Sequence, residues 1–170
     1  VTTLERAWGM QAEAQQSETQ LLQMFLDEWD AWQCGRTLNC IALVDESPAQ
    51  QYLYPEFVRW QSLFEAAGIR CLVCAPEALR CDEDGRLWQG ETAIDLLYNR
   101  LTDFTLASES CRVIQAAWRA QQSGQKHGTL ITPHPQAHAL WANKRNLAWL
   151  SDIDTLEQLG VTPEEAKAIV

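Results

Sequence analysis

The chain has 170 residues, a length that fits one domain able to bury a hydrophobic core without disulfides or bound metal. Its formal net charge of -10 argues against a surface for nucleic acid or anionic lipid, because such surfaces need clustered Lys and Arg and the 13 basic residues are scattered. No apolar run approaches the length of a membrane span, and no secretory signal or transit peptide is visible. We therefore expect a cytoplasmic protein that binds neither nucleic acid nor a membrane.

The first predicted element is a helix within residues 3–33, a stretch without proline. Its second half has an apolar face with three- and four-residue spacing, made of Leu22, Phe25, Leu26, Trp29 and Trp32. The polar stretch 11–20 is either an exposed part of this helix or a break in it, and Gly35 ends the helix. We expect residues 1–36 to form an N-terminal helical segment that packs on a sheet or docks on a neighbouring domain.

From Asn39 onward, short apolar runs alternate with stretches of helical periodicity. The predicted strands are 40–44, 69–74, 94–98 and 129–132, and the predicted helices are 54–67, 108–121, 137–150, one reaching Leu159 and one beginning at Pro163. The sequence Asp84-Gly85 predicts a hairpin that leaves the sheet. The pattern indicates an α/β fold with a Rossmann-like, open and mainly parallel sheet flanked by helices. This α/β domain is expected over 37–160, and 161–170 would begin a truncated following segment.

The chain has six cysteines, and Cys71 and Cys74 form a C-x-x-C motif inside the predicted strand 69–74. Residues three apart in a strand point to opposite faces of the sheet. No second C-x-x-C follows at the spacing of a zinc site. We therefore expect reduced, buried packing cysteines instead of a metal or redox pair.

Two segments run from a predicted strand directly into polar and charged residues, at 94–103 and 132–146. The carboxyl end of a strand in an open α/β sheet is the usual place for a ligand. Three stretches within or beside these segments resemble the pre-ATP-grasp domain of glutathionylspermidine-synthase-like and circularly permuted ATP-grasp proteins. They are Asp-Leu-Leu-Tyr-Asn-Arg-Leu-Thr-Asp (95–103), Thr-Pro-His-Pro-Gln-Ala-His-Ala-Leu (132–140) and Asn-Lys-Arg-Asn-Leu-Ala-Trp-Leu (143–150). The resemblance covers about residues 39–159.

ATP-grasp ligases phosphorylate a carboxylate with ATP and let an amine attack the acyl phosphate. The resemblance therefore implies a parent protein that uses ATP and Mg²⁺, a small-molecule carboxylate or amine as substrate, and a C-terminal ATP-grasp domain of the same protein as partner. In that family the magnesium ligands, the glycine-rich lid and the adenine pocket belong to the ATP-grasp domain, which would follow Val170. We expect this chain to be a fragment that binds no cofactor and is inactive alone.

Arg100 lies just beyond a predicted strand and suits bidentate binding of a carboxylate or acyl phosphate. Asn99 and Asp103 would orient this arginine or the attacking amine, so all three are candidate substrate-binding residues. The structural alternative is a salt bridge from Arg100 to Asp95 or Asp103 that ties down a loop.

By the same resemblance, Lys144 is the candidate contact to the nucleotide phosphates, although spacing does not separate it from Arg145 and an exposed helix lysine is the common outcome. His134 and His138 have a spacing that can bind metal on one helix face, but no carboxylate lies in register. His134 stands between two prolines and is expected to shape the turn, so no metal site is predicted.

Two other functions remain open at this point. One is a non-catalytic Rossmann-like module that serves as a scaffold or regulator. An acidic, magnesium-binding set of residues in the downstream sequence would support the ligase, and its absence would support the module. The other is a self-contained nucleotide-binding enzyme. The absence of a G-x-G-x-x-G motif after Val44 weakens this reading.

Overall fold

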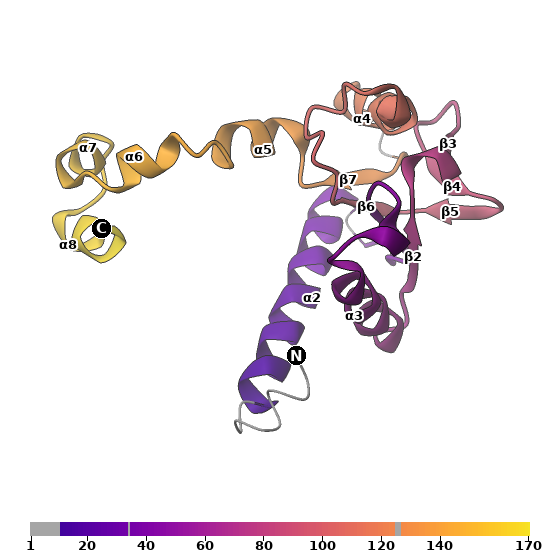
Figure 1. Cartoon of the computed structure of the whole chain (residues 1–170), viewed down its shortest axis with the longest axis horizontal. Coiled ribbons are helices and arrows are strands. Elements are labelled where there is room, and N and C mark those ends of the chain that lie inside the picture. Colours follow the sequence, from indigo (N-terminus) through magenta and orange to yellow (C-terminus); the bar gives the residue numbers. More distant parts are fainter. Residues whose placement is uncertain (1–10, 34, 125–126) are drawn as a thin grey trace. The chain divides into compact units, whose positions relative to one another are not determined.

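The computed structural model describes residues 11–33, 35–124 and 127–170. The chain divides into two compact units, one within Val1–Thr132 and one within Pro133–Val170 (Figure 1). The boundaries predicted after residues 36 and 160 lie inside these units. Among the described residues, no helix has both the length and the apolar character needed to span a membrane.

The first unit is built on a four-stranded parallel sheet. Its strands lie in the order β2-β1-β6-β7, with bounds β1 Cys40–Val44, β2 Arg70–Cys74, β6 Leu96–Asn99 and β7 Leu130–Thr132. The helices that flank it are α2 Gln11–Gln33, α3 Tyr54–Ala66 and α4 Arg112–Gln122. Short 3₁₀ turns lie at η1 Pro48–Gln50, η2 Pro76–Ala78 and η3 Glu109–Cys111. The predicted α/β fold with a parallel sheet between helices is confirmed.

The central strand β1 is buried on both faces of the sheet. Ile41 and Leu43 belong to a core shared with α2 and α3, whereas Ala42 and Val44 belong to a second core shared with α4. Figure 1 shows the same arrangement, with α2 and α3 on one side of the sheet and α4 on the other. Burial on both faces explains why β1 is an uninterrupted apolar run, as parallel strands covered by helices usually are.

Helix α2 is continuous from Gln11 to Gln33, so the polar part of the sequence does not break it. The apolar face predicted for its second half packs on the sheet. The ring of Phe25 lies 5.3 Å from that of Phe64 and 5.1 Å from that of Tyr98, both in edge-on geometry. Residues 16–20 are mostly exposed, which accounts for their polar character.

A small antiparallel sheet accompanies the parallel one. Its strands are β3 Arg80–Cys81, β4 Leu87–Gln89 and β5 Thr92–Ile94. The predicted hairpin joins β3 to β4, and the side chain of Asp82 accepts hydrogen bonds from the backbone N–H groups of Asp84 (3.1 Å) and Arg86 (2.8 Å). Gly85 lies in this turn with φ of 76°, a conformation that glycine adopts at no steric cost.

The strand predicted over 94–98 is wrong as a single element. Ile94 ends β5 in the antiparallel sheet, and Leu96 begins β6 in the parallel sheet. The residue between them, Asp95, is only 3% exposed and uses its carboxylate for the backbone N–H groups of Asn39 (2.9 Å) and Cys40 (3.1 Å). It also forms an ion pair with Arg86. These bonds fix the point at which the chain passes from one sheet to the other.

The second unit consists of short helices, α5 Pro135–Trp141, α6 Asn146–Leu150, α7 Ile153–Gln158 and α8 Pro163–Ile169. The single helix predicted over 137–150 is wrong, because a turn separates α5 from α6. In that turn the Asn143 side chain accepts a hydrogen bond from the N–H of Arg145 (3.0 Å). The predicted start of α8 is confirmed, with Thr162 as N-cap in a reciprocal capping box with Glu165.

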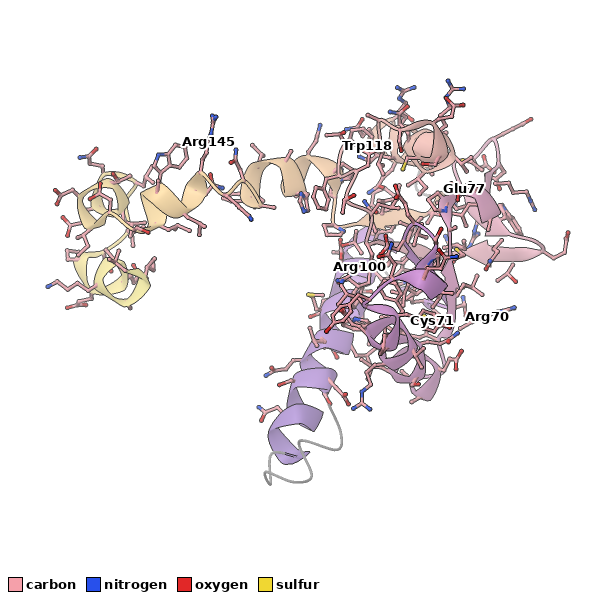
Figure 2. All side chains as sticks on the ribbon, in the orientation of Figure 1. Arg70, Cys71, Glu77, Arg100, Trp118 and Arg145 are labelled. Atoms are coloured by element: carbon pink, nitrogen blue, oxygen red, sulfur yellow. The ribbon has the colours of Figure 1, made fainter. Side chains whose placement is uncertain are left out.

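The C-x-x-C cysteines lie on opposite faces of β2, as predicted. Cys71 packs in the core that contains α2 and α3, and Cys74 packs in the core that contains α4. Both thiols are free, and burial raises the pKa of Cys71 to about 12 and that of Cys74 to about 11. Figure 2 labels Cys71 on the strand. They are packing residues with little tendency to ionise.

Candidate functional site

The carboxyl ends of β1 and β6 lie side by side in the middle of the parallel sheet. The N–H of Arg100 donates to the carbonyl of Val44 (2.9 Å), which extends the pairing one residue beyond β6. The strand order reverses at this point, because β2 lies on one side of β1 and β6 with β7 on the other. In open α/β sheets the crevice at such a reversal is the usual ligand site. The residues that follow the two strands are Asp45 and Arg100.

The Arg100 guanidinium lies between the end of β6 and the first turn of α3 (Figure 2). Its Nη1 donates to the Tyr98 hydroxyl (3.0 Å), and its Nη2 lies 3.2 Å from Oε1 and 3.4 Å from Oε2 of Glu56. The guanidinium carbon also stands 5.4 Å from the centre of the Tyr98 ring. The side chain is 23% exposed, so solvent can reach it.

The predicted alternative, a salt bridge from Arg100 to Asp95 or Asp103, is wrong. The carboxylate that meets Arg100 belongs to Glu56, 44 residues earlier in the chain. Asp95 instead pairs with Arg86 at the start of β6, and Asp103 bonds to Thr105 and Ser108. Only the packing of α3 against the sheet brings Glu56 to Arg100.

Asp45 also belongs to this site, although the sequence analysis did not single it out. It follows β1 directly, its N–H donates to the Cys74 carbonyl (3.3 Å), and its Oδ1 accepts from the N–H of Glu46 (2.8 Å). Burial raises the pKa of the Asp45 carboxyl, while the bond from Glu46 and the positive charge of Arg100 oppose this shift. Its place as the first polar residue after a predicted strand was the signal that could have identified it.

Asn99 and Asp103 brace the loop that follows β6. The buried Asn99 accepts a hydrogen bond from the N–H of Leu101 (3.0 Å). Asp103 accepts from the N–H of Ser108 (2.8 Å) and from the Thr105 hydroxyl (3.0 Å), and the bond from Ser108 is the main reason that the pKa of Asp103 lies well below its usual range. The three predicted residues thus lie at the end of β6 and in the loop that follows it, but their side chains have different partners.

The loops leaving β1 and β6 also contain backbone strain. Among the described non-glycine residues, Ser47 and Leu106 have positive φ angles, of 43° and 56°. Ser47 lies two residues after Asp45, and the fully buried Leu106 lies in the loop braced by Asp103. Such conformations cost about 1–3 kcal/mol each and tend to gather around functional sites. Both loops leave the sheet at β1 and β6, the two strands between which the strand order reverses.

Lys144 belongs to the second unit, where it lies exposed in the turn between α5 and α6 beside the exposed Arg145. His134 caps α5, and its Nδ1 accepts from the N–H of Gln136 (3.3 Å), so it shapes the turn as predicted. In the part of the chain that the structure describes, no group of three or more His, Cys, Asp and Glu side chains could hold a metal ion.

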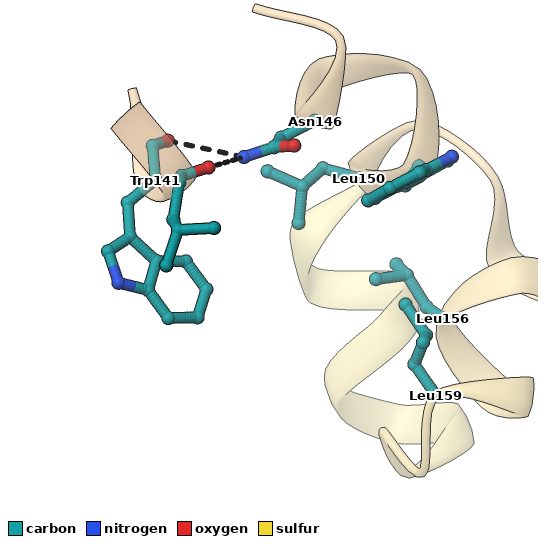
Figure 3. Close-up of a pocket in the computed structure, with 7 residues that line it drawn as sticks. Trp141, Asn146, Leu150, Leu156 and Leu159 are labelled. Atoms are coloured by element: carbon teal, nitrogen blue, oxygen red, sulfur yellow. Dashed lines mark hydrogen bonds between the residues drawn. The ribbon is translucent and has the colours of Figure 1, made fainter. Parts of the chain in front are cut away.

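The second unit also has an apolar groove of about 440 Å³ (Figure 3). Its lining includes the indole of Trp141 on one side and Leu150, Leu156 and Leu159 on the other. The Asn146 amide donates to the carbonyls of Leu140 (2.8 Å) and Trp141 (3.3 Å), which holds the end of α5 beside α6. Trp141 is 80% exposed, an unusual position for so large an apolar side chain.

Comparisons with known proteins find no match among protein-family models and none among curated proteins.

Proposed function

We propose that this chain is the Rossmann-like, pre-ATP-grasp part of an ATP-dependent carboxylate–amine ligase, in which it forms the substrate-side wall of the active site. In this proposal Arg100 holds the carboxylate of the substrate. The observation that carries it is the position of Arg100 and Asp45, which follow the two strands at which the order of the parallel sheet reverses. The resemblance of segments 95–103 and 132–150 to the ligase family agrees with that position.

The chemistry of the site fits a ligand with a carboxylate. A guanidinium is planar, always charged and able to bind both oxygens of a carboxylate or acyl phosphate. Arg100 keeps partial exposure, and Tyr98 supports it from the side. A fixed positive charge there would stabilise the negative charge that develops when a carboxylate attacks a phosphoryl group.

ATP and Mg²⁺ would be bound mainly by a C-terminal ATP-grasp domain of the same parent protein. Lys144, in the exposed turn between α5 and α6, is the proposed contact from this chain to the nucleotide phosphates. Asn99 and Asp103 contribute to substrate binding through the loop that they brace, because Asn99 holds its backbone at Leu101 and Asp103 holds it at Ser108.

The proposal is tested by Arg100→Ala in a protein that joins this chain to its ATP-grasp domain. Loss of the guanidinium removes both the orientation and the charge stabilisation of the substrate, so we expect magnesium-dependent ATP turnover to fall by about 100-fold or more. The matched control is Arg59→Ala, which removes an arginine of α3 that pairs with Glu18 of α2 and should leave turnover near the unsubstituted level. Unchanged turnover in Arg100→Ala would remove Arg100 from the active site.

A second candidate function is a non-catalytic binding or scaffold module. The exposed Trp141 beside the apolar groove of the second unit favours it, because exposed apolar surface of this kind commonly marks protein contacts. A parent protein that shows no magnesium-dependent ATP turnover, with or without a carboxylate and an amine present, would support the module over the ligase.

A further inference from the structure

Glu56 occupies the place on Arg100 where a ligand carboxylate would bind. We propose that Glu56 is an internal competitor, whose carboxylate must leave Arg100 before the carboxylate of a ligand can bind there. This inference rests on the proposed function, because it assumes that Arg100 is the carboxylate-binding residue. In this role Glu56 sets the affinity of the site for carboxylates, and it helps to hold the Arg100 guanidinium in place while the site is empty.

The contact between the two side chains has the geometry of a weak ion pair. A single nitrogen, Nη2, approaches both oxygens of Glu56 at 3.2 and 3.4 Å, whereas strong charged hydrogen bonds of this type measure about 2.7–2.9 Å. The second nitrogen, Nη1, is bound to the Tyr98 hydroxyl instead of to the carboxylate. Arg100 therefore does not use its two-pronged geometry on Glu56.

Glu56 can also leave without losing all of its contacts. Its side chain is 38% exposed, and it lies in the first turn of α3, where its Oε1 also accepts a hydrogen bond from Trp60 Nε1 (3.3 Å). Arg100 in turn keeps its bond to Tyr98 when Glu56 moves. The exchange thus replaces one carboxylate on the guanidinium by another, so the positive charge of Arg100 stays paired throughout.

This arrangement favours ligands that bring a carboxylate of their own. A neutral ligand cannot replace the negative charge of Glu56 beside the guanidinium. A ligand carboxylate can, and it can also bind to two nitrogens of the guanidinium at once. The cost of displacing Glu56 lowers the apparent affinity for every carboxylate ligand by the same factor. Removing the charge of Glu56 should therefore tighten binding.

The test is a titration of the full chain with acetate at constant ionic strength, with chloride as the balancing anion. The signal is the set of backbone amide resonances of the residues around Arg100, measured by NMR, which can be observed in every variant. We expect Glu56→Gln to bind acetate about two- to fivefold more tightly than the unsubstituted chain. This range corresponds to the free energy that an exposed ion pair usually contributes. The amide retains an oxygen for Trp60, and an unchanged melting temperature would show that α3 is intact.

Glu46→Gln is the matched control, because it removes the same charge from an exposed residue next to Asp45 that does not contact Arg100. Equal tightening in both variants would show a long-range charge effect and overturn the role of Glu56. Unchanged or weaker binding in Glu56→Gln would overturn it as well. If acetate does not bind at all, or binds Arg100→Ala as well as the unsubstituted chain, the proposed function fails and the competitor role falls with it.

Discussion

Single buried polar side chains hold the two sheets of the first unit together. The Thr129 hydroxyl, fully buried, accepts a hydrogen bond from the N–H of Leu87 (2.7 Å) and donates one to the carbonyl of Ile94 (2.7 Å). Leu87 and Ile94 are partners in the antiparallel sheet, and Thr129 directly precedes β7 of the parallel sheet. The hydroxyl therefore bonds to one backbone group on each of two neighbouring strands of the antiparallel sheet.

Thr129→Val should lower the free energy of unfolding by about 1–3 kcal/mol, the cost of leaving buried hydrogen-bonding groups unsatisfied. Valine keeps the volume and the β-branched shape, so the loss isolates the hydroxyl. Thr132→Val, three residues later in β7, is the control and should change stability little. Urea unfolding followed by circular dichroism measures both. Equal losses in the two variants would contradict the role of the Thr129 hydroxyl.

At the residue scale, the sequence predicted where a side chain lies in the fold better than it predicted which residue contacts that side chain. Arg100 was placed correctly beyond a strand end, because a short apolar run followed by polar residues marks that point. Its partner Glu56 could not be predicted, since the two residues meet only when α3 packs on the sheet. Asp45 could be placed after a strand from the sequence, but its position beside Arg100 depends on the pairing of β1 with β6.

At the scale of elements, the parallel strands place alternate residues in two separate cores. The cysteines of β1 and β2 follow this alternation, and burial raises the pKa of all three thiols, Cys40 to about 11, Cys71 to about 12 and Cys74 to about 11. Because the folded pKa values are raised, the stability gained by keeping these thiols neutral is fully present below about pH 8.5 and is lost as pH rises toward the folded values.

The three cysteines should resist alkylation by iodoacetamide at pH 8 in the folded protein. The thiolate is the reactive species, so the raised pKa values and burial predict rates about 100-fold or more below those in urea. Cys81 is only partly buried and provides an internal comparison that should react faster. Peptide mapping by mass spectrometry resolves each cysteine. Rapid labelling of Cys71 or Cys74 would contradict their packing role.

Strands 40–44 and 69–74 were predictable because each is a short run of mostly apolar residues between turn residues. The stretch 94–98 has the same appearance, yet Asp95 divides it between two sheets through bonds to Asn39, Cys40 and Arg86. Hydrophobic periodicity contains no information about these distant partners. The predicted helix 137–150 failed for a local reason, since Asn143 supports a turn between α5 and α6.

At the scale of the whole molecule, the buried core lies almost entirely in the first unit. Every residue of the two buried hydrophobic clusters lies before Pro133. In the second unit, which is described throughout, Leu156 and Ala166 are the members of the buried hydrophobic set. A small helical unit with so few buried side chains has little to offset the entropy of folding.

A chain that ends at Thr132 should therefore keep its fold, because it retains all four parallel strands and both clusters. The peptide 133–170 alone should be largely unfolded. Amide NMR spectra test both statements: the shortened chain should reproduce the dispersed signals of its core residues, and the peptide should show the narrow dispersion of an unfolded chain. Collapse of the shortened chain would contradict the assignment of the core to the first unit.

The central place of β1 also sets an order for folding. Its pairing with β2 requires only the intervening helix α3, whereas its pairing with β6 joins Ile41 to Leu96. Closing a longer loop costs more entropy and slows the formation of distant contacts. The unit β1-α3-β2 can therefore form first, with one side of β1 unpaired until β6 arrives. Arg100 reaches Glu56 only in that later step, so the candidate site is assembled late.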